Sequence, residues 1–264
     1  MTPKLSYLVC STQRSGSNLL CQLMQFSNVA GYPEEYFAPE FYNGYATDML
    51  EMPSFPDLFR DYLTAITDKR VTHNGVFGAK MMRNYVGDFC SRVRDDKSMS
   101  NEADNLKLLQ ATFPGLKFIW LKRRNKVRQA ISIVRAQLRN SYISSDDQKR
   151  PAAAAVPKDH FDYARLKKLV DGYSQADREW QRFFEKGGLE PITLDYEDMV
   201  PALGTAIPGV IEALGIELPA GYQQPQPKHE RQSDDLSQDW YERFHQQRQA
   251  DELAALKQSL REER

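Results

Sequence analysis

The sequence has few of the residues that build disulfide frameworks or metal sites. Its 264 residues include three cysteines, which form no CxxC pair, and four histidines, which form no HExxH or HxxxH pair. A disulfide-linked scaffold and a zinc site are therefore not expected, and no metal is predicted. This cysteine usage fits the reducing cytoplasm better than an oxidising compartment.

The chain also lacks a strong net charge and a long apolar run. It carries 35 Lys and Arg against 36 Asp and Glu, a formal net charge of −1, so nothing global favours nucleic acid or a membrane surface. No apolar run reaches the ~18 residues of a membrane-spanning helix, and no charged segment followed by an apolar one opens the chain. We expect a soluble cytoplasmic protein with no nucleic-acid partner and no membrane insertion.

What the chain does contain is an alternation of strand-like and helix-like segments. Strands are expected at 5–11, 75–82, 116–123 and 190–200, and helices at 18–27, 56–67, 101–113, 125–140, 161–188 and 202–216. Such alternation predicts an α/β fold in which a parallel β-sheet is flanked by helices. We expect one domain, 1–264, with an irregular excursion at 38–60, a mobile loop or lid at 144–158 and a polar helical segment at 225–264.

The stretch CSTQRSGSNLL, residues 10–20, predicts an anion site. It follows an apolar strand and leads directly into a helix, whose N-terminal N–H groups and dipole favour an anion. Ser15, Ser17 and Asn18 add hydrogen-bond donors, and Arg14 adds a planar cation. The GxxxxGK[ST] P-loop is not matched, because Gly16 is the only glycine and no lysine follows it. A helix N-cap beside a surface arginine is the alternative interpretation.

A second segment, WLKRRNKVRQAIS (120–132), repeats the passage from strand to helix. Arg124 and Ser132 are eight residues apart and could meet over one anion if the intervening turn folds back. Two anion sites at the carboxyl ends of two strands would suit a nucleotide with phosphates at both ends, at the edge where open α/β sheets bind ligands. A solvated basic helix start is the alternative.

Together these segments resemble the sulfotransferases that use 3′-phosphoadenosine-5′-phosphosulfate (PAPS), and more narrowly the bacterial Stf0 family, whose known example sulfates trehalose. The blocks that match in order are YLVCSTQRSGSNLL, GYPEEYF, NGVFGAKMM and KRRNKVRQAISIVRAQ, with ERQSD (230–234) as a fifth. Asn18 stands where the family usually has Thr, and it keeps a donor. The resemblance implies a P-loop-NTPase-like sulfotransferase fold and transfer from PAPS to a hydroxyl of a carbohydrate or small-molecule acceptor. The product nucleotide would be adenosine 3′,5′-bisphosphate.

The resemblance also implies which residues hold the donor. They come from three segments of the chain: Arg14, Ser15, Gly16, Ser17 and Asn18; Arg123, Arg124 and Ser132; and Arg231 with Gln232. Arg14 would lie beside the sulfuryl group, and the N–H groups of residues 15–18 would bind the 5′-phosphate. Arg124 with Ser132 would hold the 3′-phosphate, and Arg123 is the alternative because the arginine doublet leaves the register open by one.

The transfer further needs a base, a stabilising cation and an acceptor site. The match to the block PEEYF places the base at Glu35, with Glu34 as the alternative, and Lys80 would stabilise the transferring group or bind the acceptor. A surface acid and an exposed lysine are the alternatives for these positions. Acceptor contacts are expected from Glu34, Tyr36, Phe37 and Tyr42, although aromatic side chains at this density also fill cores.

Two other functions stay open at this point. A kinase-like phosphotransferase also uses a strand–loop–helix phosphate site, but it would need a P-loop lysine after Gly16. A nucleotide-binding module without turnover is the second, and the joint presence of Arg14, Glu35 and Ser132 argues against it. The family resemblance also implies a homodimer.

Overall fold

The computed structural model describes residues 3–97, 99–100, 102–138, 160–225 and 235–262. The chain divides into two compact units, each described by itself below: the first comprises Met1–Arg124 with Ala176–Pro227, and the second Asn125–Gln175 with Lys228–Arg264. Within the described residues, no helix combines the length and the apolar character needed to cross a membrane.

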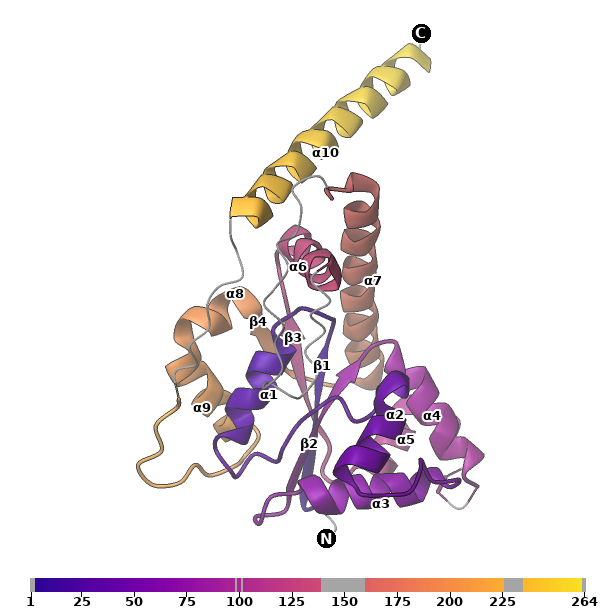
Figure 1. Ribbon diagram of the computed structural model, residues 1–264, viewed down its shortest axis with the longest axis vertical. Coiled ribbons are helices and arrows are strands. Elements are labelled where there is room, and N and C mark those ends of the chain that lie inside the picture. Colours follow the sequence, from indigo (N-terminus) through magenta and orange to yellow (C-terminus); the bar gives the residue numbers. More distant parts are fainter. Residues whose placement is uncertain (1–2, 98, 101, 139–159, 226–234, 263–264) are drawn as a thin grey trace. The chain divides into compact units, whose positions relative to one another are not determined.

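The first unit is built on a four-stranded parallel sheet (Figure 1). Its strands are β1 (Leu5–Ser11), β2 (Val76–Met82), β3 (Lys117–Lys122) and β4 (Ile192–Asp195), in the order β2-β1-β3-β4. Leu5 pairs with Val76, and Tyr7 pairs with Lys117. The parallel sheet confirms the predicted fold class.

Helices cover both faces of this sheet. Alternate side chains of a strand point to opposite faces, and in β1 Leu8 and Cys10 enter one apolar cluster while Tyr7 and Val9 enter another. The helices of the first cluster are α3 (Phe59–Arg70), α4 (Tyr85–Asp95), α5 (Asn105–Thr112) and the second half of α7 (Tyr163–Gly187). Those of the second are α1 (Ser17–Gln25) and α9 (Leu203–Ala213). Burial on both faces accounts for the nearly continuous apolar run of β1.

Three segments differ in detail from the sequence-based expectation. The strand predicted at 190–200 ends at Asp195, because the chain turns there into α8 (Tyr196–Met199) and the turn η3 (Val200–Ala202). No helix is predicted where α4 lies, although its buried residues recur at helical spacing. The excursion 38–60 contains the short turns η1 (Pro39–Phe41), α2 (Tyr42–Gly44) and η2 (Tyr45–Met49).

The second unit consists of α6 (Lys126–Leu138), α10 (Asp235–Glu262) and the first half of α7. Val134, Leu166, Trp240 and Phe244 belong to its apolar core. The helices predicted at 125–140 and 161–188 are therefore present, and the polar C-terminal segment contains a helix. The predicted lid at 144–158 lies outside the described residues.

Candidate functional site

The loop after β1 has the predicted strand–loop–helix form. β1 ends at Ser11, α1 begins at Ser17, and two residues between them are left-handed, Arg14 with φ 60° and Gly16 with φ 95°. Trp180 supports the start of the loop, since its Nε1 donates to the carbonyl oxygen of Ser11 at 3.2 Å. The first N–H groups of a helix have no acceptor within it and carry its positive dipole end. The loop therefore ends in a feature that attracts an anion. Residues 12–18, which comprise this loop and the first two residues of α1, are called the anion loop below.

Ser15 directly precedes the loop glycine, Gly16. Its side chain is fully buried, and its N–H donates to the carbonyl oxygen of Thr12 at 3.3 Å. This bond engages the N–H of Ser15, so binding of a phosphate by that N–H stays a prediction, and the backbone donors that follow it are those from Gly16 to Asn18. Ser15 Oγ is buried without a hydrogen-bond partner among the described residues, a polar atom that a bound group could satisfy.

Tyr196 and Arg123 brace this loop. A Cβ atom at Gly16 would lie 2.4 Å from Cδ2 of Tyr196, so the ring packs directly against the glycine. The guanidinium of Arg123 lies over the same ring, with Cζ 4.6 Å from its centroid, and Nη1 donates to the carbonyl oxygen of Arg14 at 3.0 Å. Tyr196 was not predicted to contact the loop, because DYEDM continues the predicted strand and carries no separate signal.

Lys80 connects the loop to the segment that carries the predicted base. Its neighbours Ala79 and Met81 belong to the cluster on the α3–α5 face, so the alternation of β2 turns Lys80 to the α1 face. Lys80 is only 5% exposed. Its Nζ donates to Oδ1 of Asn18 at 2.5 Å and forms an ion pair with Oε2 of Glu35 at 2.6 Å. Lys80 is thus a buried cation with two partners and not an exposed lysine.

The two neighbouring acids of the block PEEYF have different partners. Glu35 pairs with Lys80, whereas Oε1 of Glu34 pairs with Nη2 of Arg70 and Oε2 accepts from the hydroxyl of Tyr45 at 3.4 Å. The carbonyl oxygen of Glu34 accepts from the backbone N–H of Lys80 at 2.8 Å, which attaches this segment to β2, an edge strand. Only Glu35 thus reaches the cation that touches the anion loop.

Besides Lys80, two ionisable side chains near this carboxylate, Tyr85 and Cys21, keep their protons at physiological pH. Burial raises the pKa of the Tyr85 phenol, and the charges of Glu35 and Glu40 raise it further, so the phenol keeps its proton. Burial also raises the pKa of Cys21 to about 12, although the nearby Lys80 lowers it. A thiol of that pKa is not a nucleophile at neutral pH. The reactive groups offered by the site are a carboxylate and an amine.

The aromatic side chains predicted to contact an acceptor lie in the core. Tyr36 and Phe37 are 0% exposed and Tyr42 is 3% exposed. The phenol of Tyr42 donates to the carboxylate of Asp88 at 3.3 Å, and the rings of Phe37 and Phe89 pack edge to face. Their burial favours the core-filling interpretation, and contact of these three rings with an acceptor stays a prediction.

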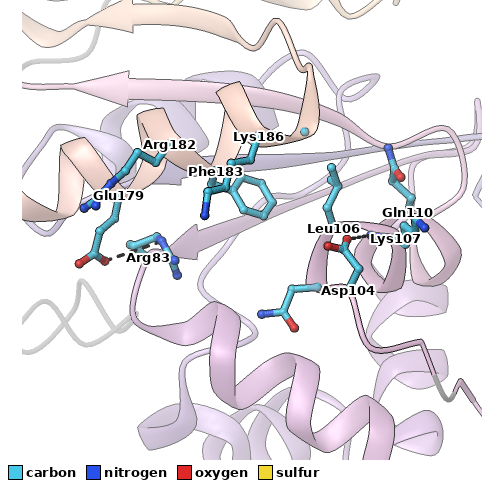
Figure 2. A pocket seen from close by; sticks show the side chains of 11 residues that line it. Arg83, Asp104, Leu106, Lys107, Gln110, Glu179, Arg182, Phe183 and Lys186 are labelled. Carbon is cyan, nitrogen blue, oxygen red and sulfur yellow. Dashed lines mark hydrogen bonds and ion pairs between the residues drawn. The ribbon is translucent and has the colours of Figure 1, made fainter.

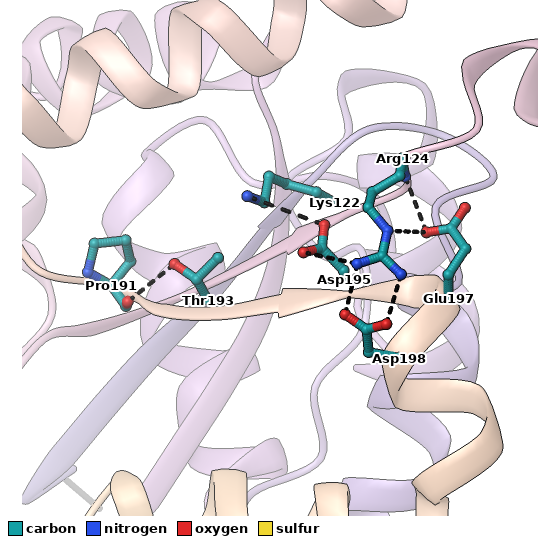
Figure 3. A network of polar contacts seen from close by, with 7 residues as sticks. All are labelled: Lys122, Arg124, Pro191, Thr193, Asp195, Glu197 and Asp198. Atoms are coloured by element: carbon teal, nitrogen blue, oxygen red, sulfur yellow. Dashed lines mark hydrogen bonds and ion pairs between the residues drawn. The ribbon is translucent and has the colours of Figure 1, made fainter.

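Arg124 lies in an acidic surrounding at the carboxyl end of β3 (Figure 3). Its Nη1 and Nη2 donate to the two carboxylate oxygens of Asp198, at 2.7 and 2.5 Å, and its backbone N–H donates to Glu197 at 2.9 Å. Asp195 lies 3.9 Å from Nη1. The Asp198 hydrogen bonds raise the pKa of Arg124, which stays charged. The two neighbouring arginines thus have different partners: Arg123 contacts the anion loop, and Arg124 contacts carboxylates.

The remaining predicted donor residues lie elsewhere in the chain. Ser132 is on α6, in the second unit, while Arg124 ends the first. Arg231 and Gln232 lie outside the described residues. Among the described residues, no group of three or more His, Cys, Asp or Glu side chains could hold a metal ion.

A cavity of about 750 Å³ lies in the first unit, away from these contacts (Figure 2). Its lining comes from the start of α5, the second half of α7 and Arg83, which follows β2 and pairs with Glu179 at 3.8 Å. None of the residues that were predicted to bind donor or acceptor is in the described lining. The candidate site is therefore defined by the loop, Lys80 and Glu35 and not by this cavity.

The chain is similar to known proteins over most of its length. A family model described as Stf0 sulphotransferase matches residues 6–247. The chain is 29% identical over 272 residues to trehalose 2-sulfotransferase of Mycolicibacterium smegmatis, covering 94% of this chain and 97% of the relative. It is 26% identical over 260 residues to trehalose 2-sulfotransferase of Mycobacterium tuberculosis, covering 90% and 93%. Among solved structures, the sulfotransferase domain of the Synechococcus PCC 7002 olefin synthase superimposes with a TM-score of 0.49 at 13% identity, covering 90% of this chain and 88% of that one.

Proposed function

Because the chain belongs to the Stf0 sulfotransferase family, we propose that it transfers a sulfuryl group from PAPS to a hydroxyl of a carbohydrate. The observation that carries the proposal is the position of Lys80 Nζ, 2.5 Å from Asn18 in the anion loop and 2.6 Å from the carboxylate of Glu35. The buried Lys80 thus contacts both Asn18, in the segment suited to bind the donor, and Glu35, which is suited to accept the proton of the acceptor hydroxyl.

The loop residues would bind the 5′ end of PAPS, which supplies the activated sulfuryl group. The N–H groups from Gly16 to Asn18 fit a phosphate, and Arg14 would add charge beside the sulfuryl oxygens. The unpartnered Ser15 Oγ supports a loop that accepts a ligand, and the packing of Tyr196 against Gly16 would hold the turn in place. Arg123 would hold the loop in this shape through the carbonyl oxygen of Arg14.

Glu35 would act as the general base. The acceptor oxygen forms a bond to sulfur while the bond from sulfur to the phosphate oxygen breaks, and the hydroxyl proton moves to the Glu35 carboxylate. Lys80 would hold that carboxylate in place and stabilise the charge that develops on the sulfuryl oxygens. Glu34 is less suited to this role, since its carboxylate pairs with Arg70 and not with Lys80, the cation that contacts Asn18.

The 3′-phosphate would be held by Arg124 with Ser132, and Arg231 with Gln232 would contact the nucleotide. For Arg124 this requires the guanidinium to exchange Asp198 for the phosphate, and Arg123 remains the alternative. Trehalose is the first acceptor to test, since both curated relatives are named for it. A homodimer is part of the proposal on the family resemblance alone, and a cytoplasmic location is proposed from the cysteine usage.

The donor is tested by calorimetric titration with adenosine 3′,5′-bisphosphate, with ATP and Mg²⁺ as control. We expect micromolar binding of the bisphosphate and much weaker binding of ATP. A preference for ATP would instead support a kinase-like phosphotransferase and contradict the proposal.

The base is tested by assaying sulfuryl transfer from PAPS to trehalose in Glu35→Gln. We expect turnover to fall by about 10²- to 10⁴-fold, because the amide cannot accept the proton, while affinity for adenosine 3′,5′-bisphosphate stays unchanged. Glu40→Gln is the matched control, since Glu40 is an exposed acid that also contacts Tyr85, at 3.1 Å. Equal losses in the two variants would contradict the role given to Glu35.

A further inference from the structure

Arg70, the last residue of α3, binds both residues that flank Glu35. Its Nη2 pairs with the carboxylate of Glu34, and its Nε donates to the hydroxyl of Tyr36 at 2.5 Å. The guanidinium also lies over the rings of Tyr32 and Tyr36, with Cζ 5.4 and 5.6 Å from their centroids. Its side chain is only 20% exposed, so these contacts are largely shielded from water.

The contacts follow the alternation of the chain around the base. Arg70 contacts the side chains of Tyr32, Glu34 and Tyr36. The side chain of Glu35, which lies between the last two, pairs with Lys80 instead. The two neighbours are thus held by one guanidinium, and the residue between them is presented to a different group. Fixing the side chains on both sides of Glu35 restricts the rotation of its own backbone.

The backbone is fixed at the same places. The N–H of Tyr32 donates to the carbonyl oxygen of Arg70 at 3.3 Å, and the N–H of Lys80 donates to the carbonyl oxygen of Glu34 at 2.8 Å. The hydroxyl of Tyr62, also on α3, donates to the carbonyl oxygen of Tyr36 at 2.8 Å. The segment that carries Glu35 is therefore held between α3 and β2.

A guanidinium suits this task better than an ammonium. Its planar fork can serve a carboxylate and a hydroxyl at once while its faces contact aromatic rings, which a lysine cannot reproduce. From these contacts we infer that Arg70 is a positioning residue, which holds the segment 32–36 so that the Glu35 carboxylate meets Lys80. The inference rests on the proposed role of Glu35 in sulfuryl transfer.

The first test needs no turnover and follows the Lys80–Glu35 pair by NMR of lysine labelled with ¹³C at Cε, assigned with Lys80→Met. We expect Arg70→Met to move the Lys80 signal in the same direction as Glu35→Gln does. Lys69→Met is the matched control, because Lys69 is the exposed neighbour on the same helix, and it should leave the signal in place. An unmoved Lys80 signal in Arg70→Met overturns the inference, whatever the role of Glu35 proves to be.

The second test is a double-mutant cycle in PAPS-dependent turnover, counted per site that binds adenosine 3′,5′-bisphosphate. Arg70→Met should lower kcat by about ten- to hundredfold with an unchanged KM for PAPS, because displacement of a catalytic group by ~1 Å has effects of this size. The kcat of Arg70→Lys should lie between those of Arg70→Met and the wild type. This variant also keeps the test possible if Arg70→Met fails to fold.

In the Glu35→Gln background, Arg70→Met should cause no further loss, because its effect acts through Glu35. Two results would overturn the inference: a full additional loss in that background, or normal kcat per binding site together with a lower melting temperature. If Glu35→Gln itself keeps full turnover, Glu35 is not the base. The NMR experiment alone then decides whether Arg70 positions the Glu35 carboxylate beside Lys80.

Discussion

At the scale of single residues, Gly16 is required for two independent reasons. Its φ of 95° is a conformation that other L residues rarely adopt, and Tyr196 occupies the space that a Cβ atom would need. Both requirements belong to the turn that leads from β1 into α1. The glycine therefore determines the shape of the anion loop.

Gly16→Ala should destabilise the protein by more than ~1 kcal/mol and weaken binding of adenosine 3′,5′-bisphosphate, because the loop must move to admit the methyl group. Urea unfolding and calorimetric titration measure the two effects. Gly87→Ala in α4 is the control: a Cβ there meets no atom of the described residues within 4 Å, so helix propensity should stabilise the protein by up to ~1 kcal/mol. Unchanged nucleotide affinity in Gly16→Ala would show that the loop does not bind the donor.

At the scale of elements, the ends of β3 and β4 place an arginine beside three acids. β4 ends at Asp195, and the first turn of α8 supplies Glu197 and Asp198, which the helix dipole favours at that position. Asp198 holds the guanidinium of Arg124 by two hydrogen bonds. A phosphate that binds Arg124 must therefore compete with Asp198.

Asp198→Asn should consequently tighten binding of adenosine 3′,5′-bisphosphate by about two- to fivefold if Arg124 binds the 3′-phosphate, a gain of the size expected for an exposed pair. Calorimetric titration measures it, and the gain should vanish in Arg124→Ala/Asp198→Asn. An effect that persists without Arg124 would assign the 3′-phosphate to another cation, of which Arg123 is the first to test.

At the scale of the whole molecule, the two compact units are interleaved in sequence. The chain passes between them at Arg124–Asn125, Gln175–Ala176 and Pro227–Lys228, and the residues of α7 are shared by both. Neither unit is a continuous segment that could fold before the rest is made. The family match at 6–247 likewise extends over both units. The single domain stays a prediction, which unfolding experiments can test.

Thermal unfolding should therefore occur in one cooperative transition. Differential scanning calorimetry should give a calorimetric enthalpy equal to the van't Hoff enthalpy, and adenosine 3′,5′-bisphosphate should shift the whole transition upward. Two separated transitions, of which only one responds to the nucleotide, would show that the units unfold independently.

Sequence patterns alone predicted the order of strands and helices and the place of the anion loop. Parallel strands alternating with amphipathic helices leave a periodic apolar signal, and Gly16 with its neighbouring serines leaves a compositional one. The missed helix α4 carries the same kind of signal in its buried residues, so it could also have been found. The end of β4 at Asp195 could not have been predicted, because the residues DYEDM are equally compatible with a strand and with the start of a helix.

The sequence by itself determined the fold class and the family, because both depend on local patterns and on short blocks in a fixed order. Only the tertiary structure decided which partner each charged residue has. It paired Lys80 with Glu35, Glu34 with Arg70 and Arg124 with Asp198, and it placed the predicted acceptor rings in the core. Such pairings join residues far apart in the chain, and no local pattern records the direction in which a side chain points once the sheet and helices have packed.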